Sequence, residues 1–402
     1  MKIIIEKKYN LCIYIFAFLV LITSESIYES VFGVLDYGLK IFLIAFFVPV
    51  LLLINRQYVK LYTLIGFAMI MCSILCILGG SVTTMEFLKI WVRFFPILFI
   101  VTFYETRGYD TFYIIYKVIL FLIILSLLFY VCFDLGVLQI QPNIIRVRME
   151  NGEYKFYREY LKIYYRWHNT RKVLGYNLVS ANGIWHEPGA YQIYINLGLY
   201  YELNMREKAS IKRILIFVVA CISSTSTAGL ILTILLLFCY FIKKSQPYIV
   251  FVFGCFIGLL CMSIILLLLQ EKALTMNWFF RVSNILESLK LLSEIHLFGA
   301  DYNNMKIWCG LLAYFIQFGI FGFIPYYLIF KSIICSTFTD EFWAKVSFFL
   351  WWFISLLDEN YSLHNIIFYI YAFLIVQNLI KHKGMPITKK TNADIKFGER
   401  CV

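Results

Sequence analysis

The fold depends on how one long apolar stretch is divided. Residues 214–241 read ILIFVVACISSTSTAGLILTILLLFCYF. This run is too long for one membrane-spanning helix, which needs about 20 residues, and short for two. A polar cluster, Ser223-Ser224-Thr225-Ser226-Thr227, interrupts it and is followed by Ala228-Gly229. The charges along the rest of the chain decide between one crossing and two.

Basic residues cluster between the apolar stretches, at Lys2/Lys7/Lys8, Arg56/Lys60, Arg206/Lys208/Lys212/Arg213, Lys243/Lys244, Lys331 and Lys381/Lys383. Loops rich in lysine and arginine face the cytoplasm in membrane proteins. These clusters share one side of the membrane only if the chain turns back at the Ser/Thr cluster. We therefore predict about twelve crossings with both termini cytoplasmic. Because non-helical backbone at membrane depth needs protein or water beside it, the Ser/Thr turn is expected to line a cavity.

The composition supports an integral membrane protein. Hydrophobic residues make up 61% of the chain and charged residues 15%, whereas soluble domains have about 45–50% and about 25%. The predicted fold class is therefore an all-α polytopic membrane protein, with one transmembrane domain over residues 1–402. The other apolar stretches are residues 11–23, 39–54, 61–79, 87–104, 112–133, 188–203, 248–269, 308–330, 346–357 and 366–380. The net charge of +12 is expected from basic residues that flank spans, and does not indicate nucleic acid.

Two long polar segments fall on the predicted outer face, residues 134–186 and 270–306. We call them loop A and loop B. Loop A is strongly basic, against the usual charge bias of outer loops. An anionic substrate is the simplest explanation.

Four basic residues of loop A, Lys155, Arg158, Lys162 and Arg166, follow the spacing i, i+3, i+7 and i+11. On a helix they form one basic stripe, with tyrosines on the other faces. Such a helix could rest on anionic headgroups, or it could hold a lipid diphosphate. Further candidate phosphate ligands in loop A are Arg146, Arg148 and Arg171.

Loop A ends in Gly183-Ile184-Trp185-His186-Glu187-Pro188-Gly189. Proline favours the first turn of a helix and gives its predecessor an extended backbone, so Glu187 is predicted at the N-cap of the next span. Its carboxylate could complement the helix dipole, or Glu187 or His186 could act as a general base toward a sugar hydroxyl. Trp185 would then be a platform for the sugar.

Loop B places Arg281 within an apolar pattern that predicts a surface helix on the membrane. An arginine at the membrane edge requires an anionic partner, so Arg281 is a further candidate ligand. The outer loops have no clustered metal ligands, and the eleven cysteines have neither zinc nor disulfide spacing. No metal or cofactor is predicted.

These features resemble the Wzy-type polymerases of O-antigen and capsule repeat units, within the O-antigen ligase/polymerase superfamily. Four motifs carry the resemblance in order: Gly183 to Gly189, Ser224-Thr225-Ser226-Thr227-Ala228-Gly229, Arg281 through a helix to Phe298-Gly299, and Phe318-Gly319-Ile320-Phe321-Gly322 in the next span, like the family's Gly-x-x-Gly helix.

The resemblance implies a glycosyltransferase of the bacterial inner membrane that needs no metal. It would transfer a growing glycan from undecaprenyl diphosphate to an incoming lipid-linked repeat unit, with Ser226 near the substrate. Expected partners are that lipid-linked oligosaccharide, membrane lipids and a chain-length regulator.

Two departures from the family pattern matter. Ser180 and Asn182 stand where relatives often have an arginine, and Asn303-Asn304 lacks the histidine usual in ligases. The second departure favours a polymerase over an O-antigen ligase. A flippase or exporter of lipid-linked sugars is the other alternative; it would be expected to spread charges through its spans and to show paired halves.

Overall fold

The computed structural model describes residues 2–23, 59–78, 84–148, 154–161, 164–167, 170–173, 176–185, 187–244, 262–263, 266–267, 270, 276–292, 297–299, 309–335, 339, 341–358 and 364–382. For some of these, including Arg148, Arg171 and Arg281, only the backbone is described.

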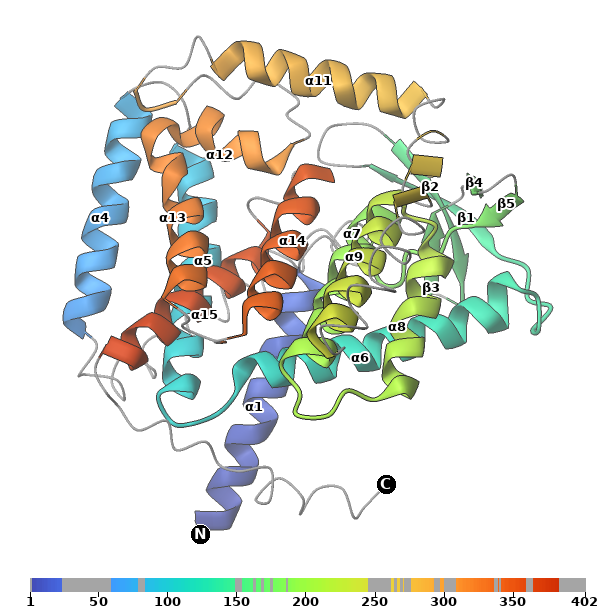
Figure 1. Ribbon diagram of the computed structural model, residues 1–402, viewed down its shortest axis with the longest axis horizontal. Helices are drawn as coiled ribbons and strands as arrows, with labels where there is room; N and C mark the ends of the chain where they lie inside the picture. Colours follow the sequence, from blue (N-terminus) through green and yellow to red (C-terminus); the bar gives the residue numbers. More distant parts are fainter. Residues whose placement is uncertain are drawn as a thin grey trace.

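The protein is mostly helical (Figure 1). Its helices are α1 (Lys2–Ile22), α4 (Val59–Leu78), α5 (Thr84–Glu105), α6 (Thr111–Phe129), α7 (Pro188–Asn204), α8 (Ile211–Ser224), α9 (Thr227–Lys244), α11 (Met276–Leu292), α12 (Gly310–Phe318), α13 (Phe323–Ile334), α14 (Phe342–Asp358) and α15 (Asn365–His382). A π-helical turn, η2 (Tyr130–Asp134), extends α6, and a 3-10 turn, η3 (Gly319–Gly322), joins α12 to α13.

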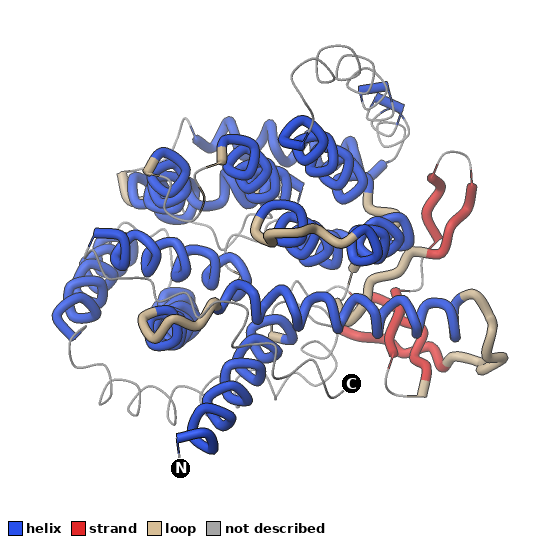
Figure 2. Tube along the Cα trace, turned by 60° about the horizontal axis from the view of Figure 1, so that its bottom comes forward, coloured by secondary structure: helices blue, strands red, loops and turns tan. Residues whose placement is uncertain are grey.

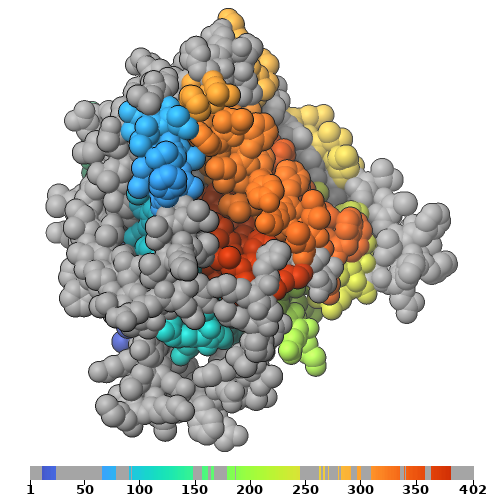
Figure 3. Space-filling view, turned by 90° about the vertical axis from the view of Figure 1, so that its left-hand side faces the viewer, coloured from blue at the N-terminus to red at the C-terminus, as the bar shows by residue number. Residues whose placement is uncertain are grey.

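Among the described residues, three helical segments are long and apolar enough to cross a membrane: Thr111–Asp134, Thr227–Lys244 and Gly310–Ile334. Large apolar side chains also lie exposed on the outside of the bundle, as on α4 and α13, which share the face in Figure 3. Phe67 and Phe323 are 58% and 59% exposed. Apolar surface of this extent is typical of helices that contact lipid.

The predicted division of residues 214–241 is confirmed. Helix α8 ends at Ser224, Thr225 adopts a left-handed backbone, and α9 begins at Thr227. Most of the other predicted spans coincide with helices; residues 39–54 and most of 248–269 lie outside the described residues.

One end of the bundle, which we call the basic end, is held together by charged side chains. Glu202 at the end of α7 is fully buried and accepts hydrogen bonds from the Arg213 Nε at 2.9 Å and the Ser210 amide at 2.6 Å. Lys243 pairs with Glu341, joining α9 to α14. The Lys381 ammonium of α15 donates to the carbonyl of Cys335, after α13. These contacts lie at the α7–α8 turn, between α9 and α14, and between α13 and α15, three places in the lower half of Figure 1.

Loop A corrects the sequence prediction, because residues 155–160 and 164–166 lie in strands rather than in a helix. Strands β1 (Asn143–Arg148), β2 (Tyr154–Tyr160) and β3 (Tyr164–Trp167) make an antiparallel sheet, and β4 (Thr170–Val173) pairs with β5 (Tyr176–Val179). The segment is rich in tyrosine, which favours strands over helix. Figure 2 shows these strands, in red, beside one end of the helical bundle.

In loop B, the predicted helix that contains Arg281 is confirmed as α11. It lies across the end of the bundle, above α12 and α14 in Figure 1.

Candidate functional site

The segment that leads into Glu187 is attached to the Ser/Thr turn. The Ala181 amide donates to the Ser223 carbonyl at 2.8 Å, and the hydroxyls of Ser180 and Thr225 share a short hydrogen bond. The segment Ser180-Ala181, just before the motif Gly183 to Gly189, therefore contacts the Ser/Thr turn, although the two lie far apart in the sequence. The sequence had identified both motifs but not their contact.

A tight turn follows, closed by Asn182. The Trp185 amide donates to the Asn182 carbonyl at 3.0 Å, and the Asn182 carboxamide donates back to the Trp185 carbonyl. Gly183 has φ +60°, and a Cβ there would lie 3.0 Å from both the Ser126 Oγ and the Tyr191 ring. Glycine is therefore required for the turn to fit between α6 and α7.

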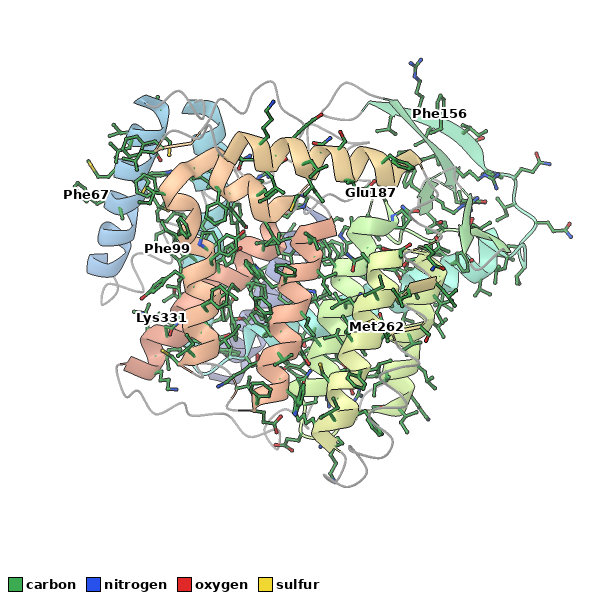
Figure 4. The ribbon with its side chains drawn as sticks, turned by 45° about the horizontal axis from the view of Figure 1, so that its top comes forward. Phe67, Phe99, Phe156, Glu187, Met262 and Lys331 are labelled. Atoms are coloured by element: carbon green, nitrogen blue, oxygen red, sulfur yellow. The ribbon has the colours of Figure 1, made fainter. Side chains whose placement is uncertain are left out.

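Glu187 occupies the predicted N-cap of α7, and Pro188 is the first helical residue. The backbone of Glu187 is extended, with φ −149° and ψ 159°, and the Glu187 side chain makes no capping hydrogen bond. Glu187 is half-buried and lies at the N-terminal, positive end of the helix dipole of α7. Figure 4 shows Glu187 near the strands of loop A, with Lys331 toward the basic end. His186 lies outside the described residues.

Trp185 lies in the protein core. It is fully buried and stacks with Tyr191 and Tyr194, with ring centroids 5.4 and 4.1 Å away. This packing fixes the start of α7, since both tyrosines belong to its first two turns. A buried ring offers no open face for a sugar, so the structure does not place Trp185 as the predicted platform.

The described arginines of loop A share one face of the sheet. Arg158 lies opposite Arg166 on β3 and opposite Ile144 on β1, and Arg146 lies opposite Phe156. Residues paired directly across antiparallel strands point to the same face. Strand pairing therefore brings together residues that the sequence had grouped on a helical stripe. Arg146 is exposed and Arg158 half-buried.

Arg166 differs from these, because it is 2% exposed and its Nε lies 2.8 Å from a carboxylate oxygen of Asp134. The same carboxylate accepts hydrogen bonds from the Tyr164 hydroxyl at 3.0 Å and the Tyr160 hydroxyl at 3.4 Å. Burial, reinforced by the Asp134 charge, raises the pKa of Tyr164 well above its ordinary value, so its hydroxyl remains a donor. Sequence reasoning missed Asp134; its position between an apolar span and an arginine-rich loop was the available signal.

Of the remaining predicted ligands, Arg148 and Arg171 lie on β1 and β4 and Arg281 lies on α11; their side chains are outside the described part. Ser226 is 2% exposed, and its hydroxyl accepts the Gly229 amide at 3.3 Å. It therefore caps α9. Within the described residues, no group of three or more His, Cys, Asp or Glu side chains could hold a metal ion.

The second pair of motifs meets. Gly319, with φ +55°, lies so close to loop B that a Cβ there would be 2.4 Å from the Leu297 carbonyl and 2.5 Å from the Gly299 amide. The Ile320 amide donates to the Leu297 carbonyl at 3.1 Å. The expected Gly-x-x-Gly helix is corrected: Gly319–Gly322 is a 3-10 break between two helices, which loop B contacts.

Comparison with known proteins gives no relative: no family model, curated protein or solved structure matches this chain.

Proposed function

We propose that this chain is a membrane glycosyltransferase that polymerises oligosaccharide repeat units. In this proposal the growing glycan leaves undecaprenyl diphosphate and is joined to an incoming lipid-linked repeat unit in O-antigen or capsule biosynthesis. The observation that carries the proposal is Glu187, a half-buried carboxylate that makes no capping hydrogen bond and follows a segment bonded to the Ser/Thr turn.

The two ends of the bundle support an orientation. Arg206, Arg213, Lys243 and Lys381 gather at the basic end, and such residues favour the cytoplasm. Glu187, the Ser/Thr turn and the strands of loop A lie at the opposite end. In the proposed topology of about twelve crossings in the bacterial inner membrane, this second end faces outward, with both termini cytoplasmic.

The proposed chemistry requires a base and a stabilised leaving group. Glu187, or His186 beside it, removes the proton of the acceptor hydroxyl as the acceptor oxygen bonds to the anomeric carbon. The bond from that carbon to the diphosphate oxygen breaks, and the lipid diphosphate leaves with the electron pair. Arg146, Arg158 and Arg281 are proposed to balance its negative charge.

The test is the glycan ladder of bacterial cells that lack the gene and carry wild type or variants. Glu187→Ala and Arg281→Ala are expected to leave one repeat unit on the final acceptor, with normal membrane abundance. Loss of a general base lowers the rate by about 100- to 10,000-fold. The matched control is Glu207→Ala, which removes an exposed carboxylate in the α7–α8 turn and should preserve the ladder.

Other results would contradict a polymerase. Long chains that accumulate on the lipid carrier in the deletion strain indicate a ligase. Absence of any repeat unit from the outer face indicates a flippase. A normal ladder from Glu187→Ala removes that residue from the mechanism.

A further inference from the structure

The turn between α8 and α9 is built around a residue in an unusual conformation. Thr225 has φ 53° and ψ 20°, in the left-handed region that β-branched residues rarely adopt. The Thr225 hydroxyl shares the short hydrogen bond with Ser180, and both side chains are buried, at 3% and 1% exposure. Such strain persists where surrounding contacts require it, and it gathers at functional sites.

The hydroxyls of this turn have separate tasks. The Ser224 hydroxyl donates to the Cys221 carbonyl at 2.7 Å, and the Ser226 hydroxyl accepts the Gly229 amide, so both bond within the α8–α9 hairpin. The Thr225 hydroxyl and the Ser223 carbonyl instead bond to the segment that approaches Glu187. Thr225 thus connects the hairpin to the candidate site.

Separate hydrogen bonds order the segment that runs from Ser180, the partner of Thr225, to Glu187. Ser180 begins it, and the reciprocal bonds between Asn182 and Trp185 close the turn that follows. The Glu187 carbonyl then accepts the Tyr191 amide at 3.1 Å as α7 begins. The same hairpin also holds α7, because Gly229 lies so close that a Cβ there would be 2.6 Å from the Cβ of Gln192. The segment before Glu187 and the helix after it therefore both contact the α8–α9 hairpin.

We propose that Thr225 and Ser180 are positioning residues, whose hydroxyl pair holds the approach segment on the α8–α9 turn and so places the Glu187 carboxylate for proton transfer. This role rests on the proposed function of Glu187. The Ser/Thr motif then acts by holding Glu187, and the buried Ser226 need not touch substrate.

The test uses purified protein with lipid-linked repeat units and measures kcat and KM separately. Thr225→Val keeps the side-chain shape and removes the hydroxyl, and Ser180→Ala removes its partner. Each is expected to lower kcat by about 10- to 100-fold with little change in KM, because displacement of a catalytic group by about 1 Å costs rate on this scale. The kcat of the double variant is expected to be no lower than that of the less active single variant, because both substitutions break the same hydrogen bond.

Two further variants separate positioning from folding. Thr225→Ser retains the hydroxyl and is expected to retain kcat. Thr225→Gly adopts the left-handed backbone without strain but lacks the hydroxyl, so it should accumulate normally and still lose kcat.

Each outcome decides the proposal. Wild-type kcat in Thr225→Gly and Ser180→Ala overturns the positioning role, while a loss in Glu187→Gln in the same assay leaves the proposed function in place. Additive losses in the double variant also overturn it, because they show two independent effects. If Glu187→Gln matches wild type, the proposed function of Glu187 fails and the positioning role fails with it.

Discussion

Arg166 shows how a single charge can attach a loop to the bundle. It belongs to β3, whereas Asp134 ends the π-helical turn after α6, and the two side chains are 2% and 0% exposed. Phe133 stacks on Tyr160 and Tyr164 beside this pair, at 5.0 and 6.0 Å between ring centroids. The sheet of loop A is thereby held to the end of a predicted span. In a buried ion pair each charge neutralises the other, so removal of one partner destabilises the folded protein far more than removal of both.

This pair predicts an asymmetric response to mutation. Asp134→Asn leaves the Arg166 charge buried and unbalanced, and is expected to cost about 3–5 kcal/mol of stability. The double variant Asp134→Asn, Arg166→Met removes both charges and should recover part of that loss. The measurement is the thermal unfolding midpoint in detergent. Arg146→Met, from the exposed arginine on the same face, is the matched control and should shift it little. A double variant less stable than Asp134→Asn would contradict the ion pair.

At this scale the sequence predicted part of the candidate site. The Glu187 N-cap followed from the local effect of Pro188 on backbone geometry, which needs no tertiary information. The ion pair of Arg166 with Asp134 depends on a contact between segments that are distant in sequence. The burial of Trp185 depends on the side chains that pack around the start of α7. The spacing of residues along the sequence predicts neither of these features.

Helices α7 and α9 approach each other closely at a glycine, where a larger side chain would not fit. Gly229 of α9 faces Gln192 of α7, and Asn196 donates to the Gly229 carbonyl at 3.3 Å while it accepts the Thr233 hydroxyl at 2.8 Å. Close approach through glycine with polar side chains beside it is the usual way in which membrane helices associate. The contact between α7 and α9 therefore depends on Gly229.

Gly229→Ala is expected to destabilise the protein by about 1–3 kcal/mol, because the added Cβ would lie 2.6 Å from Gln192 and force the helices apart. The control is Gly66→Ala in α4, where the nearest atom to the added Cβ, on Phe95, is 3.8 Å away. That change should be neutral or stabilising, since alanine favours helix over glycine by about 1 kcal/mol. Thermal unfolding of both variants in detergent makes the comparison. Equal losses would contradict this explanation, because the added Cβ at Gly66 meets no close atom.

Helices and strands were not equally predictable. Long apolar runs form helices largely independently of their surroundings. The requirement that all basic clusters lie on one side of the membrane predicted the turn at the Ser/Thr cluster, where Thr225 lies. The basic spacing in residues 155–166 was compatible with one helical stripe, but the hairpin turns at Leu161, which has φ 52°, and pairs Arg158 with Arg166. Strand pairing is a non-local choice, and tyrosine-rich composition was the local signal that favoured it.

For the whole molecule, the basic side chains gathered at one end lead to a prediction of orientation. The basic end holds the α7–α8 turn, with Arg206 and Arg213 around the buried Glu202. The strands of loop A project from the other end, where Arg146 is exposed. If the basic end is cytoplasmic, these two places lie on opposite sides of the membrane.

Single cysteines at Glu207 and Arg146, in a cysteine-free background with normal membrane abundance, test this orientation. Both positions are exposed, so a thiol at either place is open to reagent. A membrane-impermeant maleimide added to intact spheroplasts is expected to label Arg146→Cys fully and to label Glu207→Cys only after permeabilisation. The reverse pattern would place loop A in the cytoplasm, where the proposed outward-facing site could not act on a lipid-linked glycan. Labelling of both positions from outside would mean that the α7–α8 turn and loop A share one side, which one crossing by α7 does not allow.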